Sequence, residues 1–68
     1  MDLRRFLTLR TILEEGTFAR AANKLCCTQS TVTFQIRQLE AEYSVQLFEK
    51  IGRRMVPTDA ARNMMPHI

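Results

Sequence analysis

The 68-residue sequence contains few of the residues that build disulfide frameworks and metal sites. It has two cysteines, one histidine, two glycines and no tryptophan. The cysteines, Cys26 and Cys27, are adjacent in the chain, and neighbouring cysteines form a disulfide only with a strained backbone. Together with His67 they fall short of the four ligands of a typical structural zinc site. We therefore expect no disulfide, no metal and no other cofactor.

The sequence also lacks long apolar runs and catalytic motifs. No apolar segment approaches the roughly 18 residues of a membrane span, and Arg10, Glu14 and Glu15 interrupt the stretch where a secretory signal would continue. There is no Gly-rich phosphate loop and no converging carboxylate pair, and no histidine stands near Cys26 to activate it. The sequence therefore predicts a cytoplasmic protein with neither enzyme activity nor a membrane partner.

Composition and charge indicate one small basic domain. Apolar residues make up 46% and charged residues 25% of the chain, as in ordinary globular proteins. The net charge is +3, and five basic residues lie in or after the predicted third helix: Arg37, Lys50, Arg53, Arg54 and Arg62. Acidic Glu14 and Glu15 lie at the end of the first helix instead. A basic side of this kind favours binding to a polyanion.

Two apolar helical patterns lie close together in the middle of the chain. The first pattern consists of Phe18, Ala21, Ala22 and Leu25, and the second of Val32, Ile36, Leu39 and Tyr43. Each places its residues on one helix face. Thr28 is positioned to cap the second helix by accepting a hydrogen bond from the backbone N–H of Ser30 or Thr31. Two short helices separated by a tight turn predict a helix-turn-helix.

Further elements flank this pair. The apolar stripe Leu3, Phe6, Leu9, Ile12 and Leu13 predicts a helix from about residue 3 to 14. Gly16 is expected to end this helix. A broken alternation at Val45, Leu47, Phe48 and Ile51, followed by Gly52-Arg53 and Met55-Val56, predicts a short hairpin. Thr58 is expected to cap a last helix, which Pro66 would stop or kink.

The face of the 29–43 helix opposite its apolar ridge carries an unusual set of side chains. At 100° per residue, the outward residues are Ser30, Phe34, Arg37 and Ala41, flanked by Thr31, Thr33 and Gln38. No carboxylate points outward before Glu40. Amides, hydroxyls, a guanidinium and an aromatic ring are groups that contact base edges, phosphates and thymine methyls. The alternative is an ordinary exposed helix whose polar residues happen to be uncharged.

These patterns occur in an order that resembles the N-terminal winged helix-turn-helix domain of LysR-type bacterial transcriptional regulators, from Met1 to Ile68. The resemblance rests on M-D-L-R at the start, E-E-G-T-F-A-R-A-A at 14–22, T-Q-S-T-V-T-F-Q-I-R-Q-L-E at 28–40, L-F-E-K at 47–50, G-R-R at 52–54 and T-D-A-A at 58–61. It implies a mainly α fold: a three-helix winged helix-turn-helix with a short two-stranded β-wing, followed by the start of a linker helix.

The resemblance also implies a domain organisation. Residues 1–58 are expected to form the DNA-binding domain, with the helix-turn-helix motif at about 18–37 and the wing at about 46–57. Residues 59–68 are expected to begin a dimerisation linker helix. The effector-binding domain of such regulators is absent from this chain. In the intact protein we expect a homo-dimer or higher oligomer through the linker helix, and a small-molecule effector bound to the missing C-terminal domain.

For function, the resemblance implies sequence-specific binding to double-stranded DNA. The helix at about 29–43 is expected to enter the major groove, and the wing arginines to lie at the minor groove. The candidate DNA-binding residues, transferred by position, are Thr28, Gln29, Ser30, Thr31, Thr33, Phe34, Arg37, Arg53 and Arg54. Localisation would be that of a bacterial cytoplasmic protein associated with the nucleoid through its DNA.

The chain departs from the family pattern at several positions. Cys26-Cys27 stand where the family often has His-Val, Ser30-Thr31 where it often has Pro-Ala, and Phe34 where many members have a basic residue. A glycine is usual where Tyr43-Ser44 runs into the turn.

Three questions stay open. Phe34 contacts either thymine methyls or a protein. The winged helix binds DNA or, alternatively, only proteins. Cys26-Cys27 either pack as ordinary thiols or sense redox state.

Overall fold

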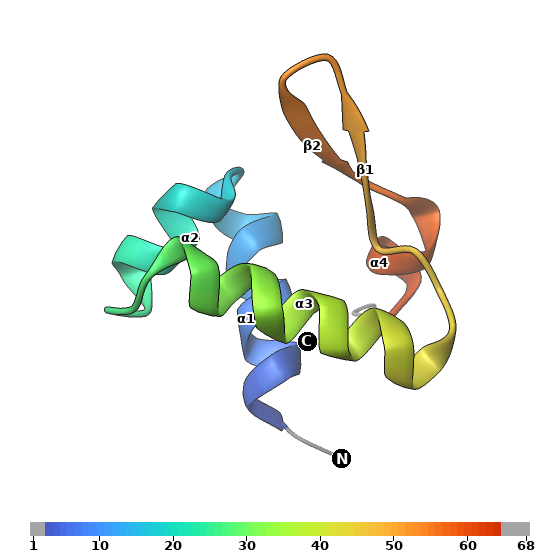
Figure 1. The fold of residues 1–68 in the computed structure, drawn as a ribbon, viewed down its shortest axis with the longest axis horizontal. Helices are drawn as coiled ribbons and strands as arrows, with labels where there is room; N and C mark the ends of the chain where they lie inside the picture. Colours follow the sequence, from blue (N-terminus) through green and yellow to red (C-terminus); the bar gives the residue numbers. More distant parts are fainter. Residues whose placement is uncertain (1–2, 65–68) are drawn as a thin grey trace.

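The computed structural model describes residues 3–64 of the chain. The elements are α1 (Leu3–Glu15), α2 (Phe18–Lys24), α3 (Gln29–Tyr43), β1 (Phe48–Ile51), β2 (Arg54–Pro57) and α4 (Asp59–Asn63). Figure 1 shows the first three helices packed as one body, from which the β1–β2 hairpin projects. The predicted mainly α fold with a two-stranded wing is confirmed. No helix within residues 3–64 is both long and apolar enough to cross a membrane.

Local capping chemistry determines where the helices begin and end. Three helices start after a threonine whose hydroxyl oxygen accepts a backbone N–H three residues later: Thr17 from Arg20, Thr28 from Thr31, and Thr58 from Ala61. Each bond satisfies one of the N–H groups that a helix start leaves without a partner. α1 ends at Glu15, and Gly16 after it adopts φ +94° and donates its N–H to the Ile12 carbonyl oxygen at 2.8 Å. These helix boundaries agree with the sequence predictions.

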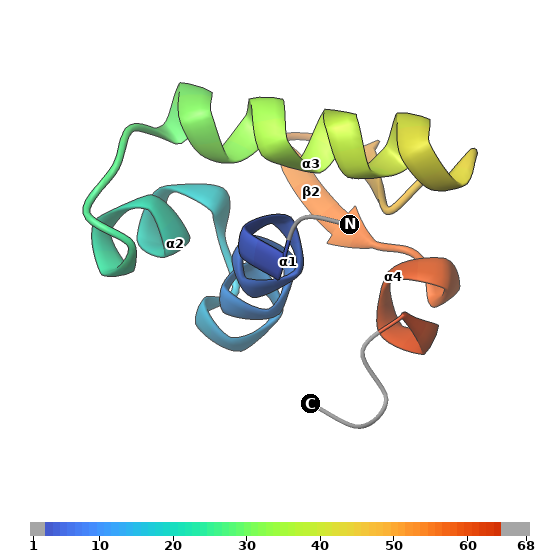
Figure 2. The ribbon, with the colours of Figure 1, turned by 90° about the horizontal axis from the view of Figure 1, so that it is seen from below.

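α3 crosses over α1 and α2, as Figure 2 shows, and buried apolar residues of these three helices form most of the core. Ala21 and Ala22 are buried on α2, and their small side chains let a neighbouring helix approach closely. The predicted apolar face of α3 is confirmed for Val32, Ile36 and Leu39, which are all buried. The wing contributes to the same core through buried Leu47 and Phe48. A small domain thus obtains one continuous core from all of its main elements.

Two residues predicted on apolar helix faces, Leu3 and Tyr43, are exposed, so the sequence patterns were wrong about their burial. Leu3 is 74% exposed because it lies in the first turn of α1, beyond the part that α3 covers. Tyr43 is 39% exposed in the last turn of α3, where its ring meets that of Phe6 edge to face, with ring centroids 5.9 Å apart. Ile51 is exposed because the hairpin tip extends away from the helices.

Ser44 ends α3 in the left-handed region, at φ 53° and ψ 43°. This conformation costs a non-glycine residue roughly 1–2 kcal/mol, whereas glycine adopts it without that steric cost but loses more entropy on folding. We expect Ser44→Gly to raise the free energy of unfolding by roughly 0.5–1 kcal/mol, measured by urea denaturation.

The matched control for Ser44→Gly is Ala41→Gly, at an exposed position inside α3. Glycine in a helix interior is less favourable than alanine by about 1 kcal/mol, so this variant should be less stable than the wild type. If both glycine variants lose stability by similar amounts, the strain attributed to Ser44 is absent.

Candidate nucleic-acid interface

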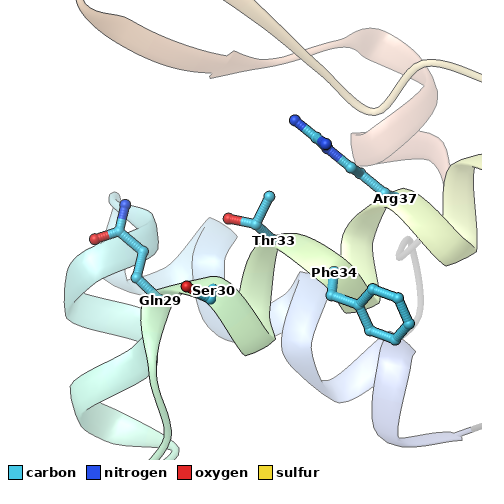
Figure 3. A pocket seen from close by; sticks show the side chains of 5 residues that line it. All are labelled: Gln29, Ser30, Thr33, Phe34 and Arg37. Atoms are coloured by element: carbon cyan, nitrogen blue, oxygen red, sulfur yellow. The ribbon is translucent and has the colours of Figure 1, made fainter.

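The outward face of α3 presents five of the predicted site residues together. Gln29, Ser30, Thr33, Phe34 and Arg37 line one shallow concave surface, and Figure 3 shows their side chains projecting from α3. Their exposure follows from the burial of Val32, Ile36 and Leu39 on the other side of the same helix. No carboxylate lines this surface. The set offers amide, hydroxyl, guanidinium and aromatic groups to a partner.

This face divides into two ridges. Gln29, Thr33 and Arg37 are four residues apart and therefore lie one above the other along α3. They line a groove of about 410 Å³ that the start of α2 and the wing complete. Phe34 lies on the neighbouring ridge and does not line the groove. In Figure 3 the Arg37 side chain points towards the wing, whereas the Phe34 ring is turned away from it.

The groove is electropositive. Arg53 and Arg54 face it from the wing and Arg37 from α3, and no carboxylate is among the residues that line it. The ion pairs between residues 3 and 64 join Arg5 to Glu42 at 3.3 Å, Arg10 to Glu14 at 3.1 Å and Arg20 to Glu15 at 3.9 Å. None of these pairs involves a groove arginine. Three unneutralised guanidinium groups on one concave surface favour a polyanionic ligand.

Two contacts position the wing against the helices. The rings of Phe18 at the start of α2 and Phe48 in β1 meet edge to face, with centroids 5.0 Å apart and an interplanar angle of 76°. A carboxylate oxygen of Glu40, on α3, accepts the backbone N–H of buried Leu47 at 2.8 Å. The Glu40 carboxylate therefore satisfies a backbone group at the base of the wing, which would cost free energy if it were left unpaired.

Further hydrogen bonds tie the two ends of the hairpin together. Thr58 donates its N–H to the Leu47 carbonyl oxygen at 2.9 Å and its hydroxyl to the Gln46 carbonyl oxygen at 2.6 Å. The Gln46 side-chain amide donates to the Phe48 carbonyl oxygen at 3.0 Å. Antiparallel pairing runs from Phe48 opposite Pro57 to Ile51 opposite Arg54. The base of the wing is thus held firmly, and the Gly52-Arg53 turn is carried at its tip.

The structure separates Thr28 and Thr31 from the other predicted site residues. Neither lines the surface formed by the five α3 side chains or the groove beside the wing. Their hydroxyl groups lie 2.9 Å apart in a hydrogen bond, and the Thr31 N–H donates to the Thr28 hydroxyl oxygen at 3.1 Å. Both residues are exposed at the start of α3. They build the helix terminus and stand at the edge of the candidate interface.

Sequence reasoning missed several residues of the interface. Gly16, Thr17 and Ala19, at the start of α2, line the groove opposite the wing arginines. Met55 also lines the groove, and Lys50, which the sequence placed on the basic side but not among the candidate site residues, pairs with Met55 and so lies on the same side of the sheet. For Lys50 a signal existed: it is two residues after Phe48, and alternation along a strand places both on one face. The α2 contribution depends on packing between distant segments and had no such signal.

Residues 3–62 match the family model for the bacterial regulatory helix-turn-helix protein, lysR family. Over all 68 residues the chain is 69% identical to the uncharacterized HTH-type transcriptional regulator YfiE of Escherichia coli (strain K12) and covers 23% of it. It is 39% identical over 67 residues to the HTH-type transcriptional regulator CitR of Bacillus subtilis (strain 168), covering 98% of this chain and 23% of CitR. The chain therefore spans less than a quarter of the length of these relatives.

Solved structures show the same fold. The complex of the BenM DBD with catB site 1 DNA has a TM-score of 0.88 and 33% identity, covering 98% of this chain and 72% of that one. The CbnR DBD–DNA complex has a TM-score of 0.88 and 30% identity, covering 97% and 76%. Both neighbours were solved with DNA.

Proposed function

Because the chain belongs to the lysR family of bacterial regulatory helix-turn-helix proteins, we propose that it binds double-stranded DNA in a sequence-specific manner as the DNA-binding part of a transcriptional regulator. The observation that carries this proposal is the groove between α3 and the wing, which has three arginines and no carboxylate. The similarity to the BenM and CbnR domains, both solved with DNA, supports it. α3 would lie in the major groove and the wing at the adjacent minor groove.

Each part of the interface has a proposed role. Gln29, Ser30 and Thr33, in the first turn and a half of α3, are placed to contact base edges. Arg37 faces the wing and is suited to a phosphate or a guanine. The hydroxyl groups of Thr28 and Thr31 lie at the N-terminus of α3, where helix geometry favours phosphate contacts. Arg53 and Arg54, at the wing tip, would enter or straddle the minor groove.

The domain organisation and assembly also belong to this proposal. Residues 1–58 would form the DNA-binding domain and residues 59–68 the beginning of a dimerisation linker helix. α4 starts this segment and is anchored by buried Ala61. The predicted kink at Pro66 lies outside the described residues. We assign to the intact regulator a homo-dimeric or larger assembly, an effector-binding domain outside this segment, no enzymatic activity and a cytoplasmic location on the nucleoid.

A gel-shift titration of full-length protein on duplex DNA at 50 and 200 mM salt tests this function. Contact with about four phosphates predicts a loss of affinity on the order of a hundredfold over this range, because binding releases condensed counterions. A winged helix that binds only proteins predicts no shifted duplex at either salt concentration. That second result would refute the proposed function.

Gln29 tests sequence reading. Its exposed amide can pair with both hydrogen-bonding groups of an adenine edge, so Gln29→Ala should cost on the order of 1–3 kcal/mol on the best duplex selected from a random pool. Affinity for random duplex should change little. Asn23→Ala, which removes an exposed amide from α2 outside the interface, is the control and should affect neither DNA. Equal losses on both DNAs would show that Gln29 does not read sequence.

Arg53 tests the role of the wing. A·T-rich tracts have a narrow minor groove with an enhanced negative potential, so Arg53→Ala should weaken binding most on sites with A·T-rich flanks. Fluorescence anisotropy on matched duplexes with A·T-rich or G·C-rich flanks measures the difference. Arg62→Ala removes the same charge from α4 and should show no dependence on the flanks. If the loss for Arg53→Ala is also independent of the flanks, Arg53 does not read groove width.

A further inference from the structure

One large apolar side chain stands exposed within the α3 surface. Phe34 is 60% exposed, and the ring–ring contacts within residues 3–64 join Phe6 to Tyr43 and Phe18 to Phe48. Phe34 takes part in neither contact and is outside the core cluster. The ring therefore contributes little to the stability of the fold, and its apolar surface is available to a partner.

The surroundings of Phe34 limit what that partner can be. The other residues on the same concave surface are polar or charged: Gln29, Ser30, Thr33 and Arg37. A protein-docking site normally needs a contiguous apolar patch of several hundred Å², which a single ring does not provide. In the major groove of DNA, the apolar group presented by base pairs is the C5 methyl of thymine. The single exposed ring of Phe34 is large enough to cover one such methyl group.

We propose that Phe34 is a specificity-determining residue that reads thymine by packing its ring against the C5 methyl group in the major groove. This inference rests on the proposed function and deepens it by adding a base preference. The site lies on the ridge turned away from the wing, whereas Gln29, Thr33 and Arg37 face the wing groove. A single helix then carries polar readout on one ridge and methyl recognition on the next.

The expected size of the effect follows from the burial of one methyl group. Such burial is worth about 0.8 kcal/mol, which corresponds to about a fourfold change in affinity for each thymine contacted. A dimer that contacts two half-sites in the same way would show about a sixteenfold change. Replacing thymine by uracil removes only this methyl and leaves the hydrogen-bonding groups of the base pair in place.

The experiment begins with selection of duplexes by the full-length wild-type protein from a random library. Each fixed thymine of the recovered motif is then replaced by uracil, and a thymine outside the motif is replaced as a control. We expect about fourfold weaker binding at one or more positions of the motif and no change at the control position. Equal affinity for the thymine and uracil forms at every position would overturn the proposal.

Variants assign the effect to the ring. Phe34→Ala should bind the thymine and uracil forms equally, and Phe34→Leu should retain part of the discrimination. Leu7→Ala, which truncates an exposed apolar residue of α1 outside this surface, should keep the full fourfold difference. A folded Phe34→Ala variant with undiminished discrimination would overturn the assignment. The thymine-to-uracil comparison with wild-type protein measures the methyl effect without any variant. Recovery of no motif at all would contradict the proposed function itself.

Discussion

Burial of one ridge of α3 is the constraint on which the rest of this structure depends. Val32, Ile36 and Leu39 are at most 3% exposed and lie against α1 and α2. Exposing each side chain would cost about 1.5–3 kcal/mol, so α3 cannot rotate about its axis without a large loss of stability. The small side chains of Ala21 and Ala22 allow the close approach that makes this packing possible. The opposite face of α3 is consequently presented to solvent in one orientation.

The wing takes its position from the same helix. Two paired strands of four residues each are not stable alone in water, so the hairpin depends on its attachment to the helices. The Glu40 carboxylate holds the Leu47 N–H, and the Phe48 ring packs against Phe18. Both contacts lie at the base of the hairpin. The orientation of the hairpin that carries Arg53 therefore depends on contacts at its base.

In the proposed complex, this geometry separates affinity from base discrimination. The groove is lined by three arginines and no carboxylate, and this positive charge favours any DNA phosphate backbone. The side chains of Gln29, Thr33 and Phe34 carry the groups that distinguish one base pair from another. The groove arginines and the base-contacting side chains are carried by a rigid helix and an anchored hairpin. A bound duplex can therefore contact both groups at the same time. Phe34 adds an apolar contact that the polar ridge of α3 cannot make.

The sequence by itself determined the elements of this protein and most residues of its candidate site. Apolar periodicity and threonine caps such as Thr28 act within a few residues, so the helix boundaries could be predicted, as could the outward face of α3. The burial of residues near helix ends could not be predicted in this way. Leu3 fits the apolar stripe but lies beyond the part of α1 that α3 covers. Only the tertiary structure decided that Arg37 faces the wing across a shared groove. That arrangement depends on contacts such as Glu40 with Leu47, which join an α3 side chain to the backbone at the base of the wing and which no local pattern encodes.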